Sequence, residues 1–73
     1  MTEPVYRLIG AKIEALRTAL GWTQADLAKR IGLTRTSVTN IEAGRQRILL
    51  HDVEKIAVAF QMTPRVLLRG VWT

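Results

Sequence analysis

The sequence has no cysteine among its 73 residues. Disulfide bonds, thiolate metal sites and cysteine nucleophiles are therefore excluded, and the core has to be stabilised by packing alone. No apolar segment approaches the roughly 20 residues that a membrane-spanning helix needs. The N-terminal segment MTEPVYRLIG carries an acid where a signal peptide carries positive charge. These absences predict a cytoplasmic protein that does not enter a membrane.

Residues that carry out catalysis or bind metals are also scarce. His51 is the single histidine, and its acidic neighbours Asp52 and Glu54 do not complete a metal site without cysteine or a second histidine. The sequence has no Ser/His/Asp arrangement, no nucleotide-cradling loop and no carboxylate-rich cluster. We therefore expect no enzyme, no metal, no cofactor and no small-molecule ligand.

Basic residues are in excess, and they concentrate in the middle of the chain. Eleven Lys and Arg stand against six Asp and Glu, which gives a net charge of +5. Residues 21–47 hold five bases and two acids (+3), whereas residues 1–20 and 48–73 each hold three bases and two acids (+1). A basic central segment indicates a polyanion as partner.

Apolar residues recur at helical spacing in five segments, and no strand pattern or internal repeat appears. The segments cover about residues 5–20, 23–32, 34–44 and 50–60, followed by the short segment MTPRVLL. At 48% hydrophobic residues, this length fits one small packed domain spanning residues 1–73. The predicted fold class is all-α.

The starts of these helices carry capping signals. Thr23 and Thr34 stand where the second and third helices begin, and Asp26 completes a capping box with Thr23. Thr63 precedes Pro64, which suits the first position of a fifth helix. The fourth helix begins without a good capping residue, so the sequence leaves its first residue open.

The second and third helices are short and are joined by a turn that contains Gly32, which predicts a helix-turn-helix over about residues 23–44. With about 100° between successive helical residues, Val38, Ile41 and Ser37 of the third helix face the core. The outer face has no acid. It carries a guanidinium, two hydroxyls, an amide and a methyl group, a combination that suits the DNA major groove: Arg35, Thr36, Thr39, Asn40 and Ala43.

The string GWTQADLAKRIGLTRTSVTNIEAGRQR resembles the phage-repressor and Cro-type (xenobiotic-response-element) helix-turn-helix family of transcriptional regulators. The most specific parts are TQADLA, the turn glycine, and the pattern T-x-x-S-V-x-x-I-E-x-G over residues 34–44. The resemblance runs from about residue 9 to residue 68. It implies a compact five-helix repressor-like domain that binds a pseudo-palindromic double-stranded DNA operator as a dimer.

The resemblance also implies roles for individual residues by their position in the pattern. Base contacts are assigned to Arg35, Thr36, Thr39 and Asn40. Phosphate contacts are assigned to Gln24, Arg45 and Arg47, and a structural ion pair to Arg17 and Glu42. Gln24 is expected in addition to brace a base-contacting residue. The family usually has Pro then Ser before the fourth helix, where this chain has Ile48 and Leu49. The course of that loop, and which basic residue touches phosphate, therefore stay open.

The C-terminal part of the chain has more apolar residues than so small a domain needs, which predicts a homodimer interface in the fifth helix and the tail. The residues are Val66, Leu67, Leu68, Val71 and Trp72, and the sequence leaves open whether Trp72 covers the core or contacts the second copy. The alternative function is an antitoxin-like or other protein-interaction module built on the same fold. The operator sequence, the sign of regulation, and a phage, restriction-modification or chromosomal origin stay open too.

Overall fold

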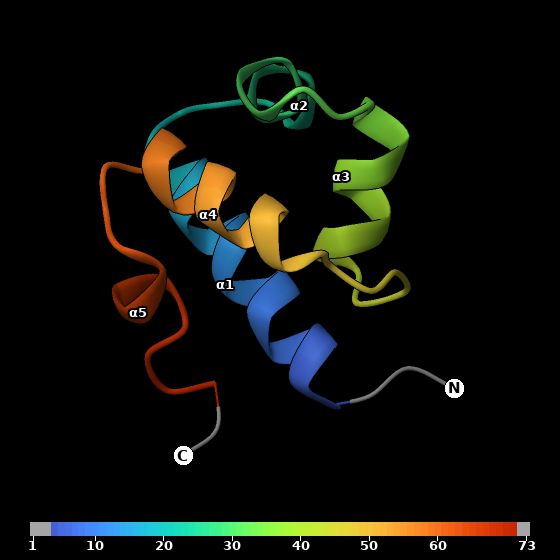
Figure 1. The fold of residues 1–73 in the computed structure, drawn as a ribbon. Coiled ribbons are helices and arrows are strands. Elements are labelled where there is room, and N and C mark those ends of the chain that lie inside the picture. The colour runs from blue at the N-terminus through green and yellow to red at the C-terminus, as the bar shows by residue number, and fades with distance from the viewer. Residues whose placement is uncertain (1–3, 72–73) are drawn as a thin grey trace.

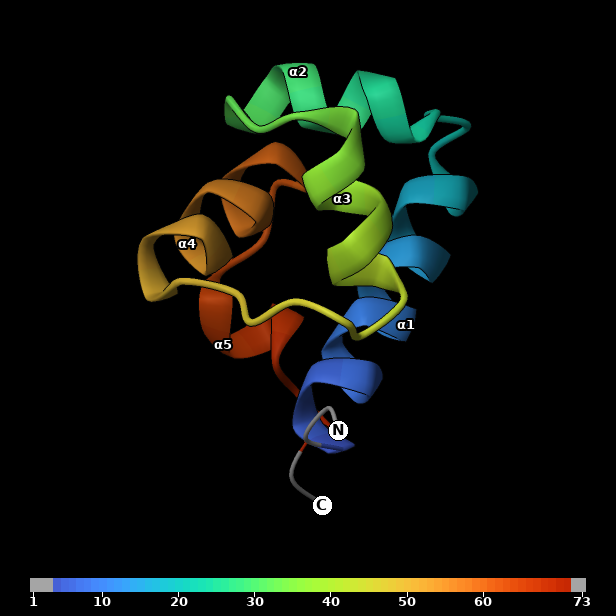
Figure 2. The same ribbon diagram turned by 90° about the vertical axis from the view of Figure 1, so that its right-hand side faces the viewer.

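The computed structural model describes residues 4–71, and within them the chain forms five helices and no strand, which confirms the all-α prediction. The helices are α1 (Pro4–Ala19), α2 (Gln24–Ile31), α3 (Arg35–Glu42), α4 (Leu50–Ala59) and α5 (Pro64–Leu67). Figures 1 and 2 show α2 at one end of the molecule and α5 toward the other, with α1, α3 and α4 between them. None of the helices in residues 4–71 has both the length and the apolar character needed to cross a membrane.

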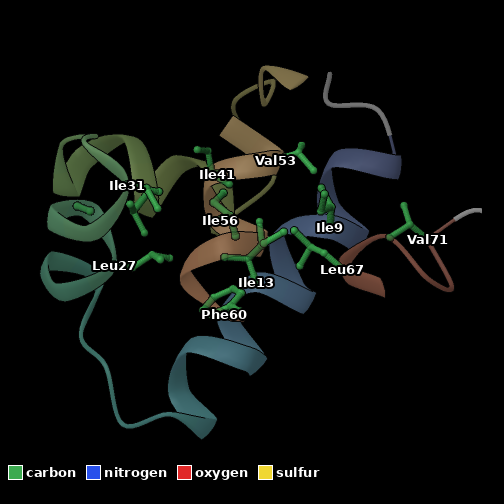
Figure 3. Close-up of a cluster of buried hydrophobic side chains, with 13 residues drawn as sticks. Ile9, Ile13, Leu27, Ile31, Ile41, Val53, Ile56, Phe60, Leu67 and Val71 are labelled. Carbon is green, nitrogen blue, oxygen red and sulfur yellow. The ribbon is translucent and has the colours of Figure 1, made fainter. Parts of the chain in front are cut away.

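The core lies where all five helices meet, and each helix contributes at least one buried apolar side chain (Figure 3). The largest side chains that are fully buried are Ile13, Val38, Leu27, Ile56 and Leu67. Burying one such side chain stabilises the fold by about 1.5–3 kcal/mol. Because the chain has no disulfide, this cluster holds the helices in their relative positions.

Three helices begin at a threonine whose side chain accepts the backbone N–H of the third residue after it. These are Thr23 before α2, Thr34 before α3 and Thr63 before α5, as the sequence predicts. Asp26 accepts in turn from the backbone N–H of Thr23 at 2.8 Å, which completes the capping box. Helix α4 follows Leu49, which provides no side-chain hydrogen bond. The start of α4 is therefore the one helix start after α1 without side-chain stabilisation.

Helix α1 touches the end of α3 almost backbone to backbone, and Gly10 makes this possible. A Cβ atom at Gly10 would fall on the carbonyl oxygens of Ile41 and Glu42. Next to it, Gly44 has a φ of +75° and lies against the backbone of Arg7. The two glycines thus allow α1 and the end of α3 to approach this closely.

Part of the apolar C-terminal segment belongs to the core rather than to the surface, which corrects the predicted dimer interface. Leu67 is fully buried and Val71 is 5% exposed, so neither offers contact area to a second copy. Val66 is 37% exposed and Leu68 is half-buried. The predicted contact through Trp72 lies outside the described residues. Helix α5 has only four residues, too few for apolar spacing along the sequence to distinguish its inner from its outer side.

Candidate nucleic-acid interface

Helices α2 and α3 form the predicted helix-turn-helix, and the turn between them depends on Gly32. This residue ends α2 with a φ of +72°, in the left-handed region that side chains with a Cβ avoid. Thr34 then starts α3 in a new direction. Figure 2 shows the result, with α2 lying across the first turn of α3.

Helix α2 is also attached to α4, through an aromatic contact. The ring of Trp22 stacks on Phe60 with 5.8 Å between the centroids, and the guanidinium carbon of Arg30 lies 4.0 Å above the Trp22 ring. Offset stacking and a cation over an indole face are both favourable. Trp22 is half-buried and packs against the core, so it fixes the position of α2.

Helix α3 has one buried face and one accessible face. Val38 and Ile41 are buried in the core. On the other side Arg35, Thr36 and Ala43 are exposed, and Thr39 and Asn40 are half-buried. Ser37, expected to face the domain, is half-buried as well.

Three of the four predicted base-contacting side chains are free of partners within the described chain. Among residues 4–71, the side chains of Arg35, Thr36 and Asn40 make no hydrogen bond or ion pair with another side chain or with the backbone. Their guanidinium, hydroxyl and amide groups therefore remain available to a ligand. The structure places these three groups together on one side of α3.

The segment after α3 adds positive charge next to this face. Arg45 and Arg47 are exposed and form no ion pair within the described part of the chain. The backbone N–H of Arg45 donates to the carbonyl oxygen of Asn40 at 2.9 Å, which holds the start of the loop against the last turn of α3. This contact keeps Arg45 next to the end of α3, and Arg47 follows two residues later in the same loop.

The predicted pair of Arg17 and Glu42 is present and buried between α1 and α3. The Nε atom of Arg17 donates to Oε2 of Glu42 at 2.6 Å, and Nη2 donates to Oε1 at 3.0 Å. A third donor, Nη1, reaches the carbonyl oxygen of Trp22 at 2.7 Å. The side chains of Arg17 and Glu42 are only 10% and 2% exposed. The hydrogen bond to Glu42 raises the pKa of Arg17 above its ordinary value.

This ion pair also determines the charge of the α3 face. Glu42 is the one acid on α3, and it is turned inward and neutralised by Arg17. Arg35, Arg45 and Arg47 form no ion pair among residues 4–71, so no acid in this part of the chain pairs with their positive charges. Such a surface attracts a polyanion.

Gln24 links the ion pair to the accessible face of α3. Its Nε2 atom donates to Oε1 of Glu42 at 3.0 Å, and its Oε1 atom accepts from the hydroxyl of Thr39 at 2.7 Å. The family resemblance implies that Gln24 braces a base-contacting residue, but it does not identify Thr39 or Glu42 as the partners. These contacts join side chains 15 and 18 positions apart in the sequence. No sequence pattern encodes such a pairing, because it depends on how α2 crosses α3.

Comparison with known proteins also identifies a helix-turn-helix domain. The model of the Helix-turn-helix family matches residues 13–67. A "hypothetical transcription factor" of Neisseria meningitidis is 36% identical over 52 residues, which cover 71% of this chain and 49% of that protein. The control protein C.BamHI of Bacillus amyloliquefaciens is 33% identical over 69 residues, covering 93% of this chain and 85% of the relative. The chain therefore spans about half the length of the first relative and most of the second.

Solved structures match over most of the chain as well. The restriction-modification controller protein C.AhdI of Aeromonas hydrophila has a TM-score of 0.80 and 35% identity, and the match covers 85% of this chain and 90% of that one. The P22 c2 repressor, solved with a synthetic operator, has a TM-score of 0.77 and 27% identity, with 85% and 94% covered. The family match spans residues 13–67, and the chain therefore belongs to the Cro-type helix-turn-helix family.

Proposed function

We propose that this protein is a transcription regulator that binds double-stranded DNA sequence-specifically, with the accessible face of α3 in the major groove. One observation carries the proposal. The side chains of Arg35, Thr36 and Asn40 have no partner among residues 4–71 and lie together on α3, and the exposed Arg45 and Arg47 follow in the next loop. The names of the relatives, a transcription factor and two control proteins, and the operator bound by the P22 repressor support it.

In this proposal the face divides into base contacts and phosphate contacts. Arginine suits the O6 and N7 atoms of guanine, asparagine suits the N6 and N7 atoms of adenine, and a threonine methyl suits thymine. We assign these contacts to Arg35, Asn40 and the two threonines of the face, Thr36 and Thr39. Because these groups come from successive turns of one helix, they face successive base pairs.

The phosphate contacts in this proposal come from the two ends of the face. Arg45 and Arg47 in the loop after α3 supply positive charge, and Gln24 supplies a donor at the start of α2. A primary amide carries two N–H groups, and Glu42 accepts one of those of Gln24. The second N–H supports the assignment of Gln24 to a phosphate oxygen.

We also propose that the protein binds its operator as a two-fold dimer and represses by occupying it. Helix α3 has eight residues, about 12 Å of helix, so one copy contacts only a few base pairs. Two copies roughly 34 Å apart would contact two half-sites in adjacent major grooves.

The dimer contact is best supported where α5 adjoins the start of α4. Leu49 and Leu50 are 59% and 79% exposed there, and Val66 of α5 is also exposed. Leu50 and Leu68 both line an apolar hollow of about 190 Å³. Exposed apolar surface of this kind marks a contact site. The interface we propose consists of Leu49, Leu50, Val66 and Leu68 and omits the buried Leu67 and Val71.

Selection of bound sequences from a random DNA pool tests the function. We expect a palindromic consensus with two half-sites. Sedimentation of the protein on that DNA should give two protomers per operator at saturation. A pool that shows no enrichment would contradict sequence-specific binding and favour a protein-interaction module, whereas one protomer per operator would contradict the dimer alone.

A further inference from the structure

The hydrogen bonds around Gln24 have a fixed direction, because they start from a carboxylate. Both carboxylate oxygens of Glu42 accept hydrogen bonds from Arg17, and a carboxylate paired in this way only accepts. The group of Gln24 that lies 3.0 Å from Oε1 of Glu42 must therefore be its NH₂ group. The amide oxygen of Gln24 consequently points the other way, toward Thr39.

The same reasoning fixes the proton of Thr39. The amide oxygen of Gln24 only accepts, so the hydroxyl of Thr39, 2.7 Å away, is the donor. Among residues 4–71, the one other hydrogen-bond partner of this hydroxyl is the carbonyl oxygen of Arg35 at 3.0 Å, and it also only accepts. A hydroxyl has one proton, and both of its possible acceptors belong to the protein. Thr39 therefore has no proton to donate to DNA and offers outward only oxygen lone pairs and a methyl group.

The four bases differ in the groups that they present to a side chain that offers only oxygen lone pairs and a methyl group. In the major groove guanine presents only the acceptors N7 and O6, whereas adenine and cytosine each present an amino donor and thymine a methyl group. We propose that Thr39 selects against guanine at the base pair it faces, and that Gln24 enforces this selection by holding the hydroxyl proton. The inference rests on the proposed DNA binding and names a specificity element within that face.

Gln24 acts here as a positioning residue. If the hydroxyl of Thr39 turned outward to donate to guanine, the amide oxygen of Gln24 would lose its donor in a half-buried place, which costs free energy. The hydrogen bonds run from Thr39 on the accessible face through Gln24 to Glu42, and the buried ion pair thus sets their direction. Arg35 is the opposite case on the same helix, because a guanidinium donates only and suits guanine.

The test compares binding to every single-base variant of the selected operator for the wild type, Thr39→Val and Gln24→Met. Thr39→Val should change the preference at one base pair per half-site and so locate the contact. At that pair the wild type should bind the variant with guanine facing α3 about tenfold more weakly than the best base. Gln24→Met should reduce that ratio to about threefold, while weakening binding to all variants through its lost phosphate contact.

Thr36→Val is the matched control, because the hydroxyl of Thr36 has no partner within the described chain. It should affect a different base pair, and Gln24→Met should leave the preference at that pair unchanged. Guanine among the preferred bases at the Thr39 pair, or no effect of Thr39→Val on any pair, would overturn the selection. A guanine ratio unchanged in Gln24→Met would overturn the positioning role. If the wild type does not rank the operator variants at all, the proposed function itself fails.

Discussion

The half of the molecule built from α2 and α3 and the half built from α4 and α5 expose different kinds of side chain. Of the six exposed large apolar residues among residues 4–71, none lies between positions 21 and 47. Four lie in the second half, at Leu49, Leu50, Val58 and Val66. The first half instead carries five bases and two acids, and both of its helices start at a threonine cap.

This difference fits the two separate contacts proposed above, one with DNA and one with a second copy. In the first half the caps and the buried ion pair hold α2 and α3 in place, and binding then costs less conformational entropy than it would for a mobile segment. In the second half uncovered apolar surface is available for a second copy. Changes in the first half should therefore affect DNA contact or the stability of a single copy. Changes to the exposed apolar residues of the second half should affect association.

The largest effect is expected when the ion pair of the first half is broken. Glu42→Gln leaves Arg17 buried without its counter-charge, and we expect the free energy of unfolding to fall by about 3–5 kcal/mol. Chemical denaturation measures it. Glu54→Gln is the control, because Glu54 is exposed on α4 and should change stability by about 0.5 kcal/mol or less. Equal stability of Glu42→Gln and the wild type would show that the pair contributes nothing.

Within the first half, base contacts and phosphate contacts should respond differently. Arg35→Ala should weaken operator binding by about 1–3 kcal/mol and relax the preference at one base pair per half-site. Asn40→Ala should act in the same way at a different pair, one turn further along α3. Arg47→Ala should weaken binding to all sequences alike and lower the salt slope by about one unit per contact removed.

The measurement for these variants is a binding series over single-base operator variants at two salt concentrations. If Arg35→Ala and Asn40→Ala leave the ranking of operators unchanged, the α3 face does not determine specificity. If Arg47→Ala changes the ranking, the loop contacts bases rather than phosphate.

In the second half, the start of α4 combines a missing cap with exposed apolar surface. Leu49→Ser supplies a capping hydroxyl, and we expect a single copy to gain about 1 kcal/mol in stability. The same change removes an apolar side chain from the proposed interface, so the dimer should become weaker. Leu49→Ala separates the two effects, because it removes the side chain without adding a cap. Denaturation and sedimentation at several concentrations measure both, and a dimer unaffected by either variant would place the interface elsewhere.

The sequence predicts best those features that depend on neighbouring residues. The caps at Thr23, Thr34 and Thr63 and the missing cap before α4 follow from side chains within three positions of the helix start. The buried face of α3 follows from its helical period, since Val38 and Ile41 lie where the spacing places them.

Features that depend on how helices cross are less accessible to the sequence. The burial of Leu67 and Val71 requires the position of α5 against the core, which Lys12 helps to fix by donating to the carbonyl oxygens of Val66 and Arg69 at 3.0 and 2.8 Å. The pattern of the family implies the pair of Arg17 and Glu42 and a bracing role for Gln24, but not that Glu42 and Thr39 are the partners of Gln24. A hydrogen-bond network of this kind can be identified only once the relative positions of α1, α2 and α3 are known.

The smallest predicted effect concerns the capping box of α2 and its dependence on pH. The hydrogen bonds from the backbone N–H and the side chain of Thr23 lower the pKa of Asp26 below its ordinary value. A carboxyl whose pKa is lower in the folded state stabilises the fold above its unfolded pKa, about 3.9, and loses that contribution as the pH falls through the folded pKa.

Asp26→Asn keeps an acceptor oxygen but cannot ionise. The difference in Tm between the wild type and Asp26→Asn should therefore be present at pH 7 and shrink as the pH falls below about 4. Thermal unfolding between pH 7 and pH 2.5 checks this, with Glu54→Gln as the control whose carboxyl takes no part in a cap. A difference that stays constant over this range would mean that the charge of Asp26 does not stabilise the start of α2.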